Sequence, residues 1–140
     1  MCVTYAKNSV NSEQVLDYLR ECNSSFSPIL ESRVDLREFS SKIIKHALIF
    51  EAWYEDELIG MLSLYYNKIC QEGYINHICV YNQYRGQGVA SKLLEMCIDS
   101  IKGEIILEVS NKNTNAIRLY KKYGFFQFDS TNNMLKMKRG

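Results

Sequence analysis

The sequence has few of the residues that build disulfide frameworks and metal sites. Its five cysteines are odd in number, and only two histidines, His46 and His77, are present. No two cysteines have the Cys-x-x-Cys spacing, and this argues against both a disulfide framework and a zinc site. We therefore expect no bound metal, and reduced thiols such as a cytoplasmic protein carries.

Charge of one sign and long apolar runs are also lacking. The chain carries a net charge of +1, so nothing favours nucleic acid or an anionic membrane as its main partner. No apolar run approaches the ~20 residues of a membrane span, and residues 1–10 lack the charged start and apolar block of a signal peptide. A length of 140 residues and a hydrophobic content of 46% fit one soluble domain over residues 1–140.

A glycine-rich turn between a strand and a helix is the most informative stretch. Residues 74–80 read as a strand, residues 83–88 (Gln-Tyr-Arg-Gly-Gln-Gly) as the turn, and residues 89–101 as a helix. The first N–H groups of a helix are unpaired and lie at the positive end of its dipole. Gly86 and Gly88 permit positive φ and a close approach to the backbone. The stretch therefore predicts an anion site suited to phosphate.

Two other glycine-loop motifs fit this turn poorly. A Walker A loop requires Gly-x-x-x-x-Gly-Lys-[Ser/Thr], and no such run exists here. A dinucleotide fingerprint, Gly-x-Gly-x-x-Gly, begins at Gly86 but meets Ser91 at its third glycine. That fingerprint also belongs after the first strand of a doubly wound sheet, whereas several strand candidates precede this turn. A well-capped helix start without a ligand is the remaining alternative.

The rest of the chain predicts a meander that leads into a βαβ crossover. Strands are expected at 3–6, 47–54, 58–66, 73–81, 104–109, 125–128 and 134–137, and helices at 11–22, 35–46, 89–101 and 115–123. Short polar links between the central strands indicate antiparallel hairpins, and Gly103 is expected to end the third helix. The order β-α-α-β-β-β-α-β-α-β-β predicts an α+β fold with a mixed sheet.

Two motifs resemble those of the GNAT superfamily of N-acetyltransferases. The turn 83–88 resembles the signature Gln/Arg-x-x-Gly-x-Gly/Ala, and Asn113-x-x-Ala116-x-x-Leu119-Tyr120-x-x-x-Gly124-Phe125 resembles the downstream motif. The resemblance covers residues 58–128 and implies the acyl-CoA N-acyltransferase fold with acetyl-CoA as co-substrate. It places the diphosphate of acetyl-CoA on Arg85, Gly86, Gln87, Gly88, Val89 and Ala90. It places the pantetheine arm along Ile78, Cys79 and Val80.

The resemblance also implies roles near the thioester. Asn113 would contact the cofactor, and Tyr120 would protonate the leaving thiolate, because a tyrosine is a proton donor at neutral pH. A backbone N–H near Val80 would stabilise the oxyanion. The base that takes the amine proton is Glu108, His77 or an ordered water chain, with Glu72 and Tyr81 as remoter options.

The two leading base candidates also have simple structural interpretations. Glu108 can be a solvent-facing strand residue. By strand alternation His77 shares a face with Ile75, Cys79 and Tyr81, and it can be a hydrogen-bonded structural histidine. An acyl-enzyme on Cys79 is disfavoured, because no histidine–acid partner is evident in the sequence.

The predicted function is transfer of the acetyl group of acetyl-CoA to a primary amine, by direct attack in a ternary complex. The expected acceptor is a small metabolite such as an amino sugar. A protein N-terminal or lysine acetyltransferase and a non-catalytic acetyl-CoA-binding or protein-interaction module are the alternatives. The first helices, the loop between them (residues 23–36) and the closing hairpin are expected to set acceptor specificity, with apolar Phe26, Ile29 and Leu30 folding back onto an apolar surface. The edge of the hairpin allows either a monomer or a homodimer.

Overall fold

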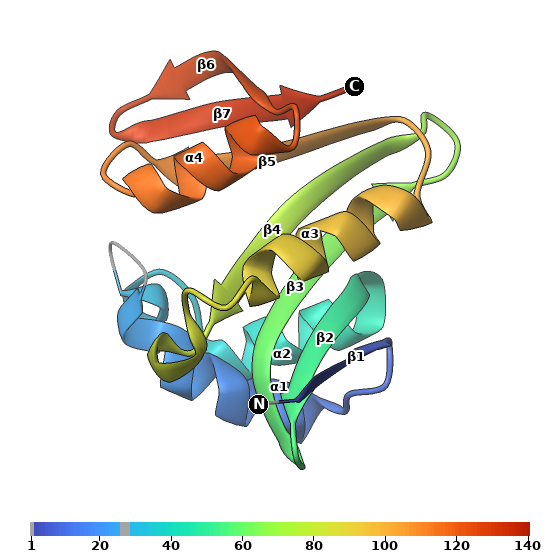
Figure 1. Cartoon of the computed structure of the whole chain (residues 1–140), viewed down its shortest axis with the longest axis vertical. Coiled ribbons are helices and arrows are strands. Elements are labelled where there is room, and N and C mark those ends of the chain that lie inside the picture. The colour runs from blue at the N-terminus through green and yellow to red at the C-terminus, as the bar shows by residue number, and fades with distance from the viewer. Residues whose placement is uncertain (1, 26–28) are drawn as a thin grey trace.

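The computed structural model describes residues 2–25 and 29–140. These residues build a seven-stranded sheet of order β1-β2-β3-β4-β5-β7-β6 (Figure 1). Its strands are β1 (Val3–Lys7), β2 (Leu48–Tyr54), β3 (Glu57–Asn67), β4 (Glu72–Val80), β5 (Glu104–Ser110), β6 (Phe126–Thr131) and β7 (Met134–Arg139). Only the β4–β5 pair is parallel in the sheet of these described residues. The predicted α+β fold with a mixed sheet is confirmed.

Helices cover the two faces of this sheet. They are α1 (Ser12–Cys22), α2 (Leu36–His46), α3 (Val89–Ser100) and α4 (Thr114–Lys122), with short 3-10 turns η1 (Asn23–Ser25), η2 (Leu30–Ser32) and η3 (Asn82–Tyr84). Figure 1 shows α3 and α4 on the same side of the sheet, as right-handed crossovers require. The Tyr123 hydroxyl after α4 donates to Glu95 Oε1 of α3 at 2.9 Å. We call the opposite face of the sheet, which carries α1 and α2, the α1/α2 face. Its part over β5 and β7 is covered by neither α3 nor α4.

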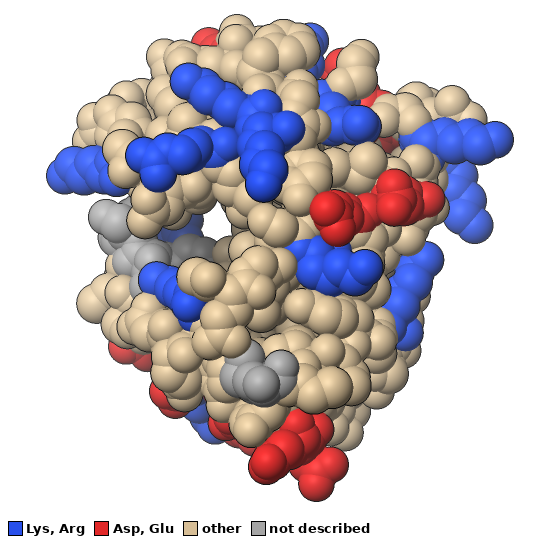
Figure 2. Space-filling model, viewed as in Figure 1, with Lys and Arg blue, Asp and Glu red and all other residues tan. Residues whose placement is uncertain are grey.

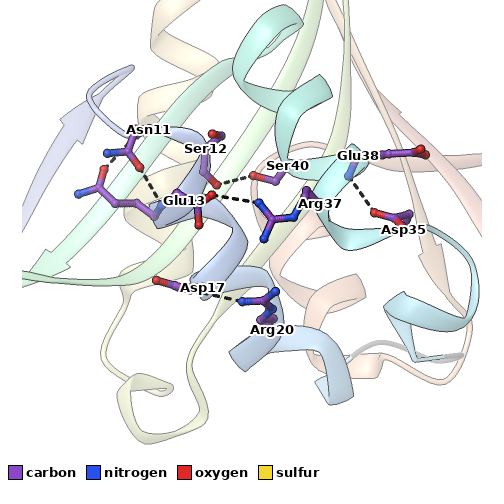
Figure 3. Close-up of polar contacts among 10 residues, drawn as sticks. Asn11, Ser12, Glu13, Asp17, Arg20, Asp35, Arg37, Glu38 and Ser40 are labelled. Carbon is purple, nitrogen blue, oxygen red and sulfur yellow. Dashed lines mark hydrogen bonds and ion pairs between the residues drawn. The ribbon is translucent and has the colours of Figure 1, made fainter.

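Local side-chain caps explain where α1 and α2 begin (Figure 3). Asn11 accepts the Gln14 N–H at 2.9 Å while Gln14 accepts the Asn11 N–H, which is a complete capping box. Asp35 accepts the Glu38 N–H at 3.0 Å. Both starts agree with the sequence prediction, since polar side chains satisfy N–H groups that a helix leaves unpaired.

The segment between α1 and α2 follows the prediction only in part. Leu30 is buried, at 4% exposure, and packs into the core as expected. Ile29 is 47% exposed, so the prediction for it was wrong. The two are chain neighbours at the start of η2, and the turn that buries one side chain directs the other outward. Phe26 and Pro28 lie outside the described residues.

Gly103 does not end α3, contrary to the sequence prediction. The helix ends at Ser100 with Ile101 as its C-cap, while Gly103 has φ +100° in the turn that follows. A Cβ at Gly103 would lie 1.8 Å from the backbone oxygen of Gln71. The glycine is needed because this turn passes directly over the β3–β4 turn. The last helix is also displaced by one residue, since Asn113 caps α4 through the Ala116 N–H at 3.2 Å.

A bulge in β4 overturns one predicted strand face. The β3–β4 register shifts between Ser63 and Leu64 and leaves Asn76 without a Cα partner. Ile75 therefore lies on the same face as Gly73. This is the face that carries α3, because a Cβ added at Gly73 would lie 3.1 Å from Ile101, just after α3. His77 lies on the opposite face, against Tyr18 of α1. Simple alternation cannot anticipate an inserted residue that reverses it.

Candidate active site

The strands β4 and β5 separate after a short pairing. They pair from Glu72–Glu104 to Ile75–Leu107, and beyond this point the described strands diverge, as Figure 1 shows. In the space-filling view an opening lies between the α4 side of the molecule and the loop before α3 (Figure 2). Exposed Arg118, Lys121 and Lys122 belong to α4, where the view shows a concentration of Lys and Arg. The divergence thus creates a gap in the middle of the sheet.

The backbone of β4 lines this gap. The Tyr81 N–H donates to Ile59 O of β3 at 2.8 Å. Successive residues of a strand direct their N–H and C=O groups to alternate sides, so those of Val80 and Ile78 point away from β3. Val80 O accepts from Arg85 Nε at 3.0 Å, which agrees with this direction. Of the three predicted pantetheine contacts, Ile78 and Val80 therefore present backbone groups to the gap, whereas the backbone of Cys79 faces β3.

The glycine-rich loop lies between the end of β4 and the start of α3. Gly86 has φ +80° and Gly88 has φ +79°, and Gly88 is the N-cap of α3. A Cβ at either glycine would meet nothing within 4 Å. Among the residues that the structure describes, none accepts a hydrogen bond from the amides between Gly86 and Ala90. Open space, positive φ and unpaired amides fit a diphosphate at the start of α3.

The side chain of Arg85 turns back onto β4. Its Nε bonds Val80 O, and its Nη2 lies 3.8 Å from Cys79 Sγ. The guanidinium thus holds the loop against the strand, and this leaves the loop backbone to meet an anion. Gln87 is exposed, whereas Val89 is buried beneath the first turn of α3.

Tyr120 approaches the same gap from α4. It is 5% exposed, packs on Phe125 with ring centroids 5.8 Å apart, and lies near enough to Cys79 of β4 that, besides burial, this thiol contributes to its raised pKa. Burial raises the pKa of Tyr120 well above that of a free tyrosine, so its hydroxyl stays protonated at neutral pH. Within residues 2–25 and 29–140 the hydroxyl makes no hydrogen bond. A buried, protonated donor at this position suits a leaving anion. Asn113, the other predicted contact from this motif, uses its side chain to cap α4.

His77 is buried beneath α1. It is 3% exposed, and its Nε2 lies 3.0 Å from the Tyr18 hydroxyl. The same hydroxyl donates to Cys79 O at 2.5 Å. Burial lowers the pKa of His77 to about 3, so the ring is neutral at neutral pH and accepts protons poorly. These contacts favour the structural interpretation of His77.

Glu108 lies on the exposed α1/α2 face, one residue past the last β4–β5 pair. Its negative charge acts on Tyr74, which pairs with Ile106 in the adjacent strand and is 39% exposed. Burial first, and then Glu108, raise the pKa of Tyr74, whereas Arg33 from the α1–α2 segment lowers it. Three elements thus bring an acid, a phenol and a guanidinium near one another on this face.

Sequence reasoning missed Tyr74 and Asn76. Both lie on the α1/α2 face beside the point where β4 and β5 separate. The adjacent polar pair Asn76–His77 within an otherwise apolar strand was the available signal, since it indicates a break in alternation. Glu72 and Tyr81 were also considered as bases. Glu72 lies at the paired end of β4, and Tyr81 is buried and stacks on Tyr18.

The described part of the chain holds no cluster of three or more His, Cys, Asp or Glu side chains arranged to bind a metal. None of the five cysteines, all of them among the described residues, forms a disulfide. In residues 2–25 and 29–140, no helix has the length and apolar character needed to cross a membrane.

Comparison with known proteins identifies the family. The model of the acetyltransferase (GNAT) family matches residues 12–125. The chain belongs to this family. Three similar proteins illustrate the relationship of this GNAT chain to others. N-alpha-acetyltransferase 30 of Saccharomyces cerevisiae is 41% identical over 59 residues, which are 39% of this chain and 34% of that protein. The chain therefore aligns with about a third of that relative's length.

Two solved structures share the fold of this GNAT chain over nearly its whole length. PaiA N-acetyltransferase from Thermoplasma acidophilum, in complex with coenzyme A, has a TM-score of 0.79 at 17% identity and covers 99% of both chains. Arabidopsis thaliana Naa50, in complex with the bisubstrate analogue CoA-Ac-MVNAL, has a TM-score of 0.75 at 23% identity. It covers 100% of this chain and 99% of its own.

Proposed function

We propose that the protein transfers the acetyl group of acetyl-CoA to a primary amine. The observation that carries this proposal is the gap between β4 and β5. An anion-binding loop closes one end, Tyr120 approaches from the α4 face, and Glu108 lies on the opposite face. A thioester threaded through the gap would meet a proton donor on one side and an incoming amine on the other.

The loop and β4 would hold acetyl-CoA. Its diphosphate would bind the free amides at Gly86–Ala90, and exposed Arg118, Lys121 and Lys122 on α4 add positive charge. The pantetheine arm would run along Ile78 and Val80 and bond the backbone groups of Ile78, because the C=O of Val80 already accepts from Arg85 Nε. The N–H of Val80 would then be available to the oxyanion that forms when the amine attacks.

Proton transfer completes the reaction. The attacking amine loses a proton, for which Glu108 is the exposed acceptor on the α1/α2 face. The departing thiolate gains a hydrogen bond or a proton from the Tyr120 hydroxyl. His77 suits the base role less well, since a buried imidazole whose pKa is about 3 takes up protons only in acid.

We infer that the acceptor is the N-terminal amine of a polypeptide. Relatives named N-alpha-acetyltransferase 30 align with the chain, and one fold neighbour is solved with a peptide-bearing bisubstrate analogue. This departs from the small-metabolite acceptor expected from sequence and follows the protein N-terminal alternative. The α1/α2 face over β5 and β7, which no described helix covers, leaves room for an extended acceptor.

A two-step assay tests the proposal. Acetyl-CoA should raise the melting temperature, and coenzyme A release should then depend on a peptide with a free N-terminus. The same peptide with a blocked N-terminus is the control. Thermal stabilisation without release on any amine would instead favour a non-catalytic acetyl-CoA-binding module.

A further inference from the structure

Asn76 occupies the vertex at which β4 and β5 separate. It is the first residue of β4 beyond the Ile75–Leu107 pair, and Glu108 is the first residue of β5 beyond it. The bulge places Asn76 on the same face as Ser63, which is the α1/α2 face. The two polar side chains therefore flank the point where the acceptor amine would approach.

A bond to Ser63 orients the Asn76 amide. The Ser63 hydroxyl donates to Asn76 Oδ1 at 2.5 Å. This distance falls in the range of O–H···O bonds and below that of N–H···O bonds, so the atom facing Ser63 is the oxygen. Asn76 Nδ2 consequently points away from Ser63. It is buried and has no hydrogen-bond partner among the described residues.

A buried donor without an acceptor is unfavourable, and native proteins hold few of them. Ser63 is itself fully buried, so the structure keeps two polar side chains at this position in the sheet. Two apolar side chains could pack at the bulge without the cost of an unpaired donor. A ligand that brings an oxygen to Nδ2 would supply the missing bond.

We propose that Asn76 Nδ2 binds an oxygen on the carbon next to the amine-bearing carbon of the acceptor, and so selects amines that carry such an oxygen. This inference rests on the proposed function. The carbonyl oxygen of an α-aminoacyl group lies about 3 Å from its amine nitrogen, given standard bond lengths. Such a group reaches Glu108 with its nitrogen and Asn76 with its oxygen. A peptide N-terminus offers a carbonyl, and a 2-amino sugar offers a hydroxyl, at the same place.

Three acceptors test this selection. They are a short peptide amide with a free N-terminus, glucosamine, and isobutylamine, which has no oxygen. With kcat/KM expressed per unprotonated amine, because the three amines differ in pKa, the wild type should favour at least one oxygen-bearing acceptor over isobutylamine by about tenfold, the size of one hydrogen bond. If the peptide shows this preference, Asn76 binds a carbonyl oxygen; if glucosamine shows it, Asn76 binds a hydroxyl.

Asn76→Ala should remove that preference, mainly through KM, and leave isobutylamine turnover within about twofold. Asn76→Asp keeps the size but removes the donor, so it should behave alike. Ser63→Ala keeps Asn76 but frees its amide to turn, and should lose part of the preference. Asn67→Ala, at the exposed end of β3 beside the β3–β4 turn, is the matched control and should keep it.

An unchanged preference in Asn76→Ala would overturn the inference alone. An equal loss on all three acceptors together with a lower melting temperature would overturn it too, and would make Asn76 a structural pin of the bulge. No coenzyme A release by the wild type on any acceptor would overturn the proposed function, and the inference with it.

Discussion

Replacing Gly88 with alanine separates the loop's role in binding from its role in folding. Gly88 has φ +79°, and a left-handed conformation costs a non-glycine residue about 1–2 kcal/mol. In a chain of 140 residues that lowers the melting temperature by roughly 3–8 °C. The added methyl meets nothing within 4 Å in the protein, so no clash adds to this cost. It projects instead into the open space where the diphosphate is proposed to lie.

Gly124→Ala is the matched control. Gly124 has φ +90° after α4, and its added Cβ would lie 3.6 Å from Arg139, an ordinary contact. Both variants should therefore lose similar stability without ligand. Calorimetric titration should show that only Gly88→Ala weakens acetyl-CoA binding, by about tenfold or more. Unchanged binding in Gly88→Ala, or an equal loss in Gly124→Ala, would refute the assignment of the loop.

Three further results should follow. Tyr120→Phe should lower kcat by about a hundredfold while acetyl-CoA affinity stays within about twofold; an unchanged kcat would remove Tyr120 from the acid role. Glu108→Gln should lower kcat/KM for the amine by about tenfold or more, and a normal value would point to a water chain. For His77 the unfolded chain binds a proton near pH 6.5, whereas burial lowers the folded pKa to about 3. Stability is therefore full above about pH 6.5 and falls by about 2 kcal/mol on acidification to about pH 5. The free energy of unfolding of His77→Gln, measured by denaturant melts, should depend less on pH than that of the wild type. The same pH dependence in both would contradict the burial of a neutral His77.

Local chemistry made the element order and the helix starts predictable from sequence. Asn11 and Asp35 cap their helices because short polar side chains satisfy N–H groups that the helix itself cannot. The strand–glycine–helix stretch was equally readable, since Gly86 and Gly88 both take positive φ. These features depend on neighbours within a few residues, and all were found without a structure.

Features that depend on distant parts of the chain were not predictable. The bulge at Asn76 follows from pairing with Ser63 on another strand, and it moved Ile75 to the opposite face from His77. The role of Gly103 depends on Gln71 passing within contact distance, so the sequence suggested a helix cap instead. The proximity of Tyr74, Glu108 and Arg33 likewise arises only when β4 and β5 pair beneath the α1–α2 segment.

Mass spectrometry of the acceptor shows directly whether the protein acetylates an N-terminal amine. The protein would be incubated with acetyl-CoA and a peptide that has a free N-terminus and no lysine, with Tyr120→Phe in parallel. We expect a peptide heavier by one acetyl group, located on the terminal nitrogen, and formed much more slowly by the variant. A peptide of unchanged mass, although acetyl-CoA binds, would contradict this expectation.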